Sequence, residues 1–358
     1  MTSLIAALLI FDCIITFHEF GHFLLARKAG IAVIEFSIGM GPRLITFVHG
    51  GTRYSLKLLP LGGSCAMLGE SLTEEDLKYL RAPKALVGMS YEKAGILQRF
   101  LTIFAGPAFN FLLAFAGSCF LVCVAGSDPA RVGKIAPESP AMAAGLQEGD
   151  EIISLNGYRT YIFRDLMIYG TFHEGEPLRV VYERDGKREN CEITPEYSEE
   201  KNAYQIGIIG GGYERAENPG AVIRYAYAES RYWAYVTVKS IEKLITRKAS
   251  ADNIGGPVRI VGMIGDTVEK SKPYGALTIA VNLAAMTVLL SVNLGIMNLL
   301  PVPALDGGKL ILIFLELIRG KRLSKQTEYR INLFGAALLM ALMMFAVFND
   351  FRMFFRPS

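Results

Sequence analysis

Two histidines and a glutamate lie close together in one apolar segment, in the run HEFGH that begins at His18 and ends at His22. An H-E-x-x-H run places both imidazoles on one face of a helix, where they can bind a single Zn²⁺. The glutamate between them, Glu19, can then take a proton from a zinc-bound water. The chemistry that this spacing predicts is metal-assisted hydrolysis.

The segment that carries the motif is apolar and long enough to cross a membrane. Residues 3–26 hold only Asp12 as a charged residue outside the motif, and about 20 apolar residues span the hydrocarbon core. Ionisable groups inside such a helix are costly to bury and are usually functional. The alternative is a structural pair of histidines whose hydrogen bonds are satisfied. The start of the chain lacks a basic region, so we expect a span and not a cleaved signal.

The composition indicates a membrane enzyme with an extramembrane part. Of the 358 residues, 51% are hydrophobic and 20% are charged, and the formal net charge of +3 is too small to favour a nucleic-acid partner. Three further segments are predicted to span the membrane, at 101–125, 276–300 and 331–348. Segment 221–246 is rich in charges, which predicts an amphipathic helix on a surface instead of a span.

The short loop 319–330 sets the predicted orientation. It holds five basic residues against one acid, and basic residues in short loops mark the cytoplasmic side. Both termini and the long segment 126–274 are then expected outside the cytoplasm. The chain is predicted to be a multi-pass membrane protein.

A zinc site of this kind needs a third protein ligand. The chain has four histidines, and the other two, His49 and His173, stand in a Gly-flanked turn and in the predicted exposed domain. A carboxylate is the better candidate, because zinc sites with two histidines and one carboxylate are common. Asp306 ends the third predicted span at the same expected depth as the motif. Its alternative role is the N-cap of a helix that begins near Lys309.

Three runs together resemble the site-2 protease family of intramembrane zinc metalloproteases, in its bacterial regulator-of-sigma-E branch. They are HEFGH, FAGPAFN and NLLPVPALDGG, and the likeness covers almost the whole chain, including the C-terminal FNDFRMF. The resemblance implies Zn²⁺ as cofactor, His18, His22 and Asp306 as its ligands, and Glu19 as catalytic base. It also implies residues that bind or position the substrate: Asn110, Asn293, Asn298, Pro301 and Pro303. For Asn110, a hydrogen bond between helices is an equally good interpretation.

Residues 31–70 alternate like short strands, with turns predicted at 39–42 and 50–51. In the family this loop re-enters the membrane as a β-hairpin whose edge can pair with an extended substrate. The resemblance therefore implies that Gly62 and Gly63 lie at a substrate-binding edge. The following run SCA departs from the aromatic and basic residues that are usual there, so the side-chain contacts at this edge stay open.

Residues 131–195 resemble a bacterial PDZ domain, a fold whose groove accepts extended C-terminal tails. A helix is expected between Ser139 and Gly145, followed by strands in EIISLNG, LRVVYERDG and KRENCEITP. The alternative is a domain that only packs against the membrane part. The predicted domains are 1–126 with membrane helices and the hairpin (about 31–70), 127–197 as an extracytoplasmic PDZ domain, 198–275 as an extracytoplasmic linker with amphipathic helices, and 276–358 with the last two membrane helices.

The expected fold class is an α-helical polytopic membrane protein with four transmembrane helices, a re-entrant β-hairpin and one inserted α+β PDZ domain. The expected function is a zinc endopeptidase that cuts transmembrane segments of single-span proteins. The resemblance implies anti-sigma factors or signal-peptide remnants as substrates, a site-1 protease that acts first, and membrane lipid as the surroundings. A PDZ scaffold that keeps zinc without turnover is the alternative, and the presence of Glu19 disfavours it.

Asp12 is not explained by the family pattern. It lies seven positions before Glu19, two helical turns away on nearly the same face. An ionised aspartate facing lipid is costly, so we predict that Asp12 lines a polar cavity roughly 10 Å from the metal along the helix. The alternative is a protonated Asp12 bonded to a neighbouring helix.

Overall fold

The computed structural model describes residues 2–70, 86–246 and 255–354. The chain divides into two compact units, and each is described by itself. One, the membrane unit, comprises Met1–Ala114 and Lys243–Ser358, and the second unit is Phe115–Glu242.

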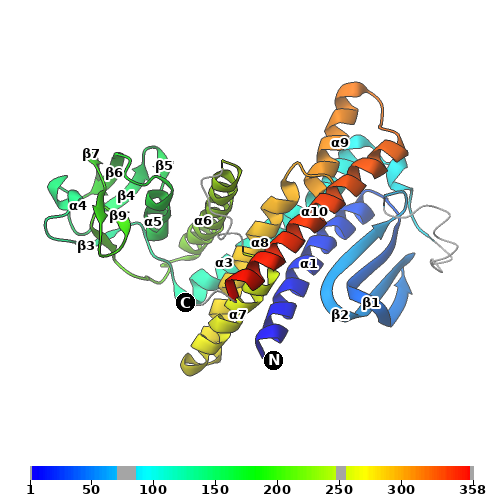
Figure 1. Ribbon diagram of the computed structural model, residues 1–358, viewed down its shortest axis with the longest axis horizontal. Helices are drawn as coiled ribbons and strands as arrows, with labels where there is room; N and C mark the ends of the chain where they lie inside the picture. Colours follow the sequence, from blue (N-terminus) through cyan, green and yellow to red (C-terminus); the bar gives the residue numbers. More distant parts are fainter. Residues whose placement is uncertain (1, 71–85, 247–254, 355–358) are drawn as a thin grey trace. The chain divides into compact units, whose positions relative to one another are not determined.

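Four helices in the described part are long and apolar enough to cross a membrane. They are α1 (Thr2–Lys28), α3 (Ile96–Ala125), α8 (Ala276–Leu299) and α10 (Lys325–Phe354) (Figure 1). All four predicted spans are thus confirmed as helices, and the last is longer than the predicted 331–348. An integral membrane protein is the class that these four helices support.

Close helix packing brings α1 against two neighbours in the membrane unit. Buried Ile10 and Ile14 pack against Ile264 of α7 (Pro257–Ser271). On another side, Gly21 lies against α3, where an added Cβ would collide with the backbone of Ala105. The glycine inside HEFGH therefore lets α1 and α3 approach until their backbones touch.

The segment between α8 and α9 (Asp306–Arg319) folds back tightly on itself. Ala304 has a positive φ of 74°, and an added Cβ on Gly307 or Gly308 would collide with the carbonyl oxygens of Leu300 and Val302. Helix α9 begins at Asp306, three residues before the predicted start. The paired glycines of LDGG are thus needed for the fold-back that presents Asp306.

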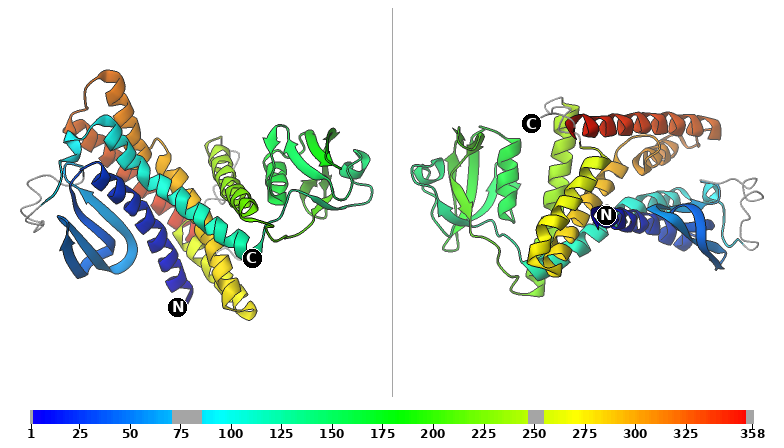
Figure 2. Two further views of the ribbon diagram at one scale, coloured as in Figure 1. Left: turned by 180° about the vertical axis from the view of Figure 1, so that it is seen from behind. Right: turned by 60° about the horizontal axis from the view of Figure 1, so that its bottom comes forward.

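A long hairpin of β1 (Val33–His49) and β2 (Thr52–Met67) lies beside α1, as Figures 1 and 2 show from opposite sides. The predicted reversal at 50–51 is confirmed. The turn predicted at 39–42 is wrong, because β1 continues through it with shifts of register between Ile38 and Arg43. Gly39 and Gly41 have positive φ angles of 81° and 89°, so they bend the strand without reversing it. A position of this hairpin inside the membrane stays a prediction.

Both strands bend so strongly that one part of β1 has two partners. Residues 35–38 pair with 53–56 on one side and with 63–66 on the other. Residues 63–66 pair with β1 on one side only. This leaves an edge of β2 next to α1.

The second unit holds a four-stranded antiparallel sheet in the order β5-β4-β6-β7. Its core combines Ile152 and Leu155 of β4 with Leu166 and Tyr169 of α5. The elements are β3 (Val132–Ile135), α4 (Pro140–Ala143), β4 (Glu151–Leu155), β5 (Tyr158–Arg159), α5 (Phe163–Phe172), β6 (Leu178–Arg184), β7 (Lys187–Ile193), β8 (Glu196–Ser198), β9 (Ala203–Gln205) and β10 (Ile208–Gly210). The helix and the three strands predicted within 131–195 are present, and the sheet region is PDZ-like.

Helix α6 (Pro219–Ile245) confirms the predicted charged helix within 221–246. Its polar side chains bind the PDZ-like part of the second unit: Glu229 pairs with Arg164, and Arg231 pairs with Asp165 of α5. The helix is thus held against its own unit through these polar side chains, and its position on a surface stays a prediction. Residues 247–254 of the predicted linker lie outside the described residues.

Candidate metal centre

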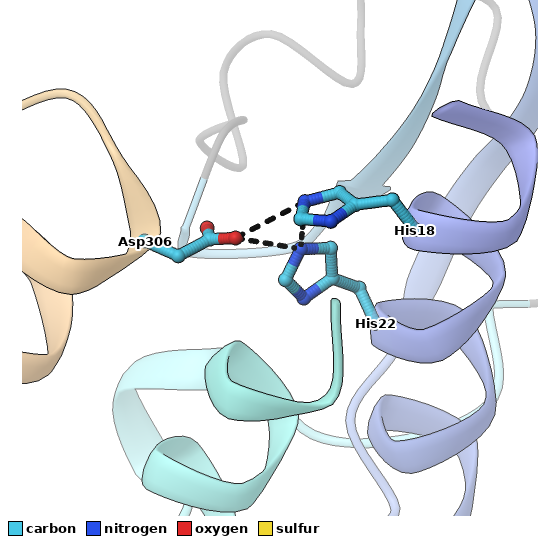
Figure 3. Close-up of side chains that lie close together, drawn as sticks. All are labelled: His18, His22 and Asp306. Atoms are coloured by element: carbon cyan, nitrogen blue, oxygen red, sulfur yellow. Dashed lines mark hydrogen bonds and ion pairs between the residues drawn. The ribbon is translucent and has the colours of Figure 1, made fainter. Parts of the chain in front are cut away.

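Three side chains from two distant parts of the sequence meet in the membrane unit. His18 and His22 project from α1 toward Asp306 at the start of α9 (Figure 3). Nε2 of His18 lies 3.1 Å and Nε2 of His22 lies 3.3 Å from Oδ2 of Asp306. The two Nε2 atoms are 3.2 Å apart. Within the described residues, these three form a group that could hold a metal ion.

The group is buried, and a glycine makes room for it. The exposed fractions of His18, His22 and Asp306 are 7%, 6% and 8%. Gly106 of α3 lies directly against both rings, and a Cβ at this position would collide with His22. A side chain on this turn of α3 would fill the space between the histidines, so the site requires glycine there.

The ring of His22 is oriented by α3. Its Nδ1 lies 2.9 Å from the backbone carbonyl oxygen of Thr102. A carbonyl can only accept, so Nδ1 carries a proton, and in the neutral ring Nε2 then keeps a lone pair that faces Asp306. A hydrogen bond of this kind behind a histidine is the usual support of a metal ligand.

The ring of His18 is supported by Asn110, also on α3. Nδ2 of Asn110 lies 3.2 Å from Nδ1 of His18, and Asn110 is fully buried. Its Oδ1 is buried without a hydrogen-bond partner among the described residues. Turning the amide over would let Oδ1 accept the Nδ1 proton, which leaves Nε2 free to bind a metal. The observed contact is the interhelical hydrogen bond, and a contact of Asn110 with substrate stays a prediction.

The donor set fits zinc. Two imidazole nitrogens and one carboxylate oxygen converge, and Oδ2 of Asp306 has no hydrogen-bond donor in the described part of the chain. Two histidines and a carboxylate with a fourth position open are the ligands of catalytic zinc sites. A bound cation would use the free acceptor of Asp306. The free acceptor of Asn110 would take the Nδ1 proton of His18 once the amide is turned over.

Glu19 lies on the side of α1 that faces the hairpin. Its Oε2 accepts a hydrogen bond of 2.8 Å from the backbone N–H of Cys65 in β2. Cys65 is buried and belongs to the edge formed by residues 63–66. The proposed base and the proposed substrate-binding edge are therefore in direct contact.

The other predicted substrate-binding residues surround this region in different ways. Gly62 and Gly63 lie against α1, near Ile15 and Glu19. Asn293 and Asn298 are half-buried on α8, Pro301 is exposed just after it, and Pro303 packs against Gly335 of α10. Their positions at the end of α8 are compatible with the predicted role, which stays a prediction.

Sequence reasoning missed three residues that build the centre. Thr102 orients His22, Gly106 provides the space for both rings, and Ser291 of α8 donates to the carbonyl oxygen of Asn110 over 2.8 Å. Gly106 and Asn110 both stand in the run FAGPAFN, and their spacing of four residues was a signal that they share a helix face. The backbone contact of Thr102 has no signal in its residue type.

Comparison with known proteins gives the family. Residues 6–342 match the model of the family described as Peptidase family M50.

The chain belongs to peptidase family M50.

Curated relatives match over nearly their full lengths. The zinc metalloprotease RasP of Geobacillus kaustophilus is 31% identical, with 99% of each chain covered. The regulator of sigma-W protease RasP of Bacillus subtilis is 29% identical, with 99% of each chain covered. The probable protease eep of Enterococcus faecalis is 29% identical, with 99% of this chain and all of that protein (100%) covered. The M50 family and these names support a zinc metalloprotease.

Solved structures of PDZ domains match part of the chain. The PDZ domain of an SdrC-like protein from Listeria monocytogenes is 24% identical, with a TM-score of 0.22, and the match covers 23% of this chain and 87% of that domain.

Proposed function

We propose that this M50 peptidase is a zinc endopeptidase that cuts single-span membrane proteins within their transmembrane segments. The observation that carries the proposal is the convergence of His18, His22 and Asp306, which are buried among apolar helices with one possible ligand atom each, all within 4.8 Å of one another. A peptidase site at this place reaches substrates that also lie in the membrane.

Zinc at this site would be held by His18, His22 and Asp306, and when bound it supplies Lewis acidity that polarises a carbonyl and makes water more acidic. The chain's own residues do the rest. Glu19 accepts a proton from the water that attacks the carbonyl carbon of the peptide bond. As the C–N bond breaks, Glu19 gives this proton to the leaving nitrogen, so the products are a carboxylic acid and an amine.

The edge of β2 supports the binding of an unwound substrate. A helical substrate hides its peptide bonds, whereas an extended strand beside residues 63–66 would expose them next to Glu19. Strand addition uses main-chain hydrogen bonds and so requires little sequence specificity. The N–H of Cys65, which now binds Glu19, is one group that such a strand can take. Gly62 and Gly63 allow its backbone to approach, and Asn293, Asn298, Pro301 and Pro303 are proposed to hold it from α8.

Residues 127–197 of the second unit are proposed to form an extracytoplasmic PDZ domain that selects substrates. Domains 1–126 and 276–358 are then the membrane core, and 198–275 links them to the PDZ domain. The basic loop 319–330 supports a cytoplasmic side at that loop. Both termini and the PDZ domain then face outward from a bacterial inner membrane.

The substrate class follows from this arrangement and from one relative. The Bacillus subtilis protein is named regulator of sigma-W protease, which supports a membrane-bound anti-sigma factor as the substrate here. Remnants of signal peptides have the same single-span form. Bulky outer domains would be removed first by a site-1 protease, and a PDZ domain can recognise the C-terminal tail that such a cut creates.

The test replaces the proposed base. Purified Glu19→Gln protein should keep about one zinc per chain, because the three ligands remain, and should fail to cut a single-span model substrate in lipid. Glu328→Gln, a change at an exposed acid of α10, is the matched control and should cut normally. Cutting by Glu19→Gln near the wild-type rate would exclude the proposed mechanism. A zinc-loaded wild-type protein that cuts nothing would favour the PDZ scaffold.

A further inference from the structure

A line of polar residues continues along α1 from Glu19 toward the start of the helix. Asp12, Thr16 and Glu19 stand at positions i, i+4 and i+7, which share one helix face. The strand β2 lies over this face: a Cβ added to Gly63 would lie 3.5 Å from Cγ of Glu19 and 3.9 Å from Oγ1 of Thr16. The line therefore reaches the same edge that holds the proposed base.

Two oxygens of this line are buried without a hydrogen-bond partner in the described part of the chain. They are Oδ1 of Asp12 and Oγ1 of Thr16. Other threonines in the membrane helices satisfy their hydroxyls on the preceding turn, as Thr102 does with Gln98 and Thr287 does with Leu283. Thr16 makes no such bond. Buried polar groups in native proteins are almost always paired, and those that lack a protein partner bind ordered water.

The groups on this line match what water requires. The carboxylate of Asp12 accepts hydrogen bonds, and the hydroxyl of Thr16 both donates and accepts. One helical turn separates them, about 6 Å at 1.5 Å per residue, a gap that one or two water molecules bridge. Gly62 and Gly63 put no side chain over the line.

We propose that Asp12 and Thr16 bind a file of ordered water that supplies Glu19 from the N-terminal end of α1. The proposal rests on the proposed function, since hydrolysis consumes one water for each peptide bond cut and the metal centre itself is buried. It also explains why a helix in a membrane carries Asp12, which the metal centre does not use.

The first experiment measures access of water and does not depend on turnover. Zinc-loaded full-length protein in lipid vesicles carries a single cysteine from Asp12→Cys, Thr16→Cys or Leu9→Cys, each in a background in which all five native cysteines are replaced by alanine. Leu9 is the matched control, because it lies on the same helix and is 62% exposed on the apolar outside of the structure. A charged, membrane-impermeant maleimide should label positions 12 and 16 at least about tenfold faster than position 9, which lipid covers. Equal labelling at all three positions overturns the water file.

The second experiment measures whether cleavage depends on this ordered water. Thr16→Val and Asp12→Leu should each lower kcat about tenfold by displacing ordered water, with KM and zinc content unchanged. Asp12→Asn, which still binds water, should recover most of the rate. Thr287→Val is the control, because its hydroxyl is satisfied within its own helix. Unchanged kcat in both Thr16→Val and Asp12→Leu overturns the supply role. If the wild type cuts nothing, the proposed function fails, and the labelling pattern alone then decides whether the water file exists.

Discussion

Both units of the chain bury ionisable side chains, and Asp306 of the membrane unit is balanced differently from the buried carboxylates of the second unit. In the second unit each buried carboxylate faces a guanidinium. In the membrane unit Asp306 faces two imidazoles whose neutral forms carry lone pairs. A buried charge without a partner is strongly destabilising, and the zinc of the proposed function would balance Asp306. In that proposal the burial of charge serves the fold in the second unit and metal binding in the membrane unit.

The charges of the second unit's network are paired with one another. Arg164 binds Asp128 and Glu229, with distances of 2.9 Å and 2.5 Å, and Arg231 lies 2.8 Å from Asp165. Burial alone would lower the pKa of Arg164, but its hydrogen bonds with Asp128 and Glu229 raise that pKa above its ordinary value. The network therefore stays charged, and it fastens α6 to α5 without any ligand.

The largest expected effect comes from removing the carboxylate of the candidate metal centre in the membrane unit. Asp306→Ala should lower zinc content to about a tenth of wild type or less under equal metal supply, and activity should fall with it, because a zinc ligand is lost. Asp306→Glu should keep part of both. Metal analysis of purified protein and cleavage of a single-span substrate measure the two quantities.

Asp165→Asn is the control, since it alters a buried carboxylate of the second unit. It should leave zinc content unchanged. Wild-type zinc content in Asp306→Ala would assign Asp306 the alternative role of ending and capping α9, and another carboxylate would have to bind the metal.

The next effect concerns the support behind His18. Asn110→Leu removes the partner of Nδ1 and should weaken zinc binding roughly 10- to 100-fold, the usual range for groups behind a ligand. Asn110→Asp offers a carboxylate that accepts the Nδ1 proton, so it should bind zinc more tightly than Asn110→Leu. Competition with a zinc chelator gives the affinity. Asn282→Leu, at an amide bonded to Ser271 instead, is the control, and an equal loss in both variants would count against the orienting role of Asn110.

Residue types and spacing were enough to predict the parts of the site that lie within single elements. The H-E-x-x-H helix, the four spans and Asp306 at a helix start follow from local patterns. The supports did not follow, since Thr102 acts through its backbone across 80 residues of sequence from His22. The hairpin was predicted with an extra turn, because Gly39 and Gly41 indicate a reversal as readily as the bend that the structure has. Contacts of this kind depend on how elements pack, which a local pattern does not contain.

A third change removes the central guanidinium from the charge network of the second unit and should leave zinc binding unchanged. Arg164→Met leaves Asp128 and Glu229 without their guanidinium and should lower the free energy of unfolding of this unit by about 3–5 kcal/mol. The fluorescence of Trp233 reports this unfolding, because it is the one tryptophan of the chain and its Nε1 donates to Glu229. Zinc content should stay at the wild-type value. Arg188→Met, at a loose pair with a 69% exposed arginine side chain, should change stability by less than about 1 kcal/mol, and equal losses in the two variants would contradict a structural network.

The smallest expected effect on catalysis comes from removing the PDZ-like part altogether. Val132 and Gly210 are partners in the β3–β10 pair, so deleting 132–210 leaves two ends that a short glycine linker can join. The deletion also removes Arg164 and Asp165, which leaves Asp128 and the charged residues Glu229 and Arg231 of α6 without their partners. The deletion should therefore carry Asp128→Asn, Glu229→Gln and Arg231→Gln as well.

This neutralised deletion should bind zinc and cut a short single-span substrate at a rate within about threefold of wild type, because no proposed ligand or base lies in the second unit. Its discrimination against substrates with bulky outer domains should be lost. The plain deletion, with Asp128, Glu229 and Arg231 unchanged, should be less stable, since unpaired charges remain. A neutralised deletion that is folded and zinc-loaded but inactive would mean that the second unit helps to form the active site, and the separation between a structural and a functional unit would then be wrong.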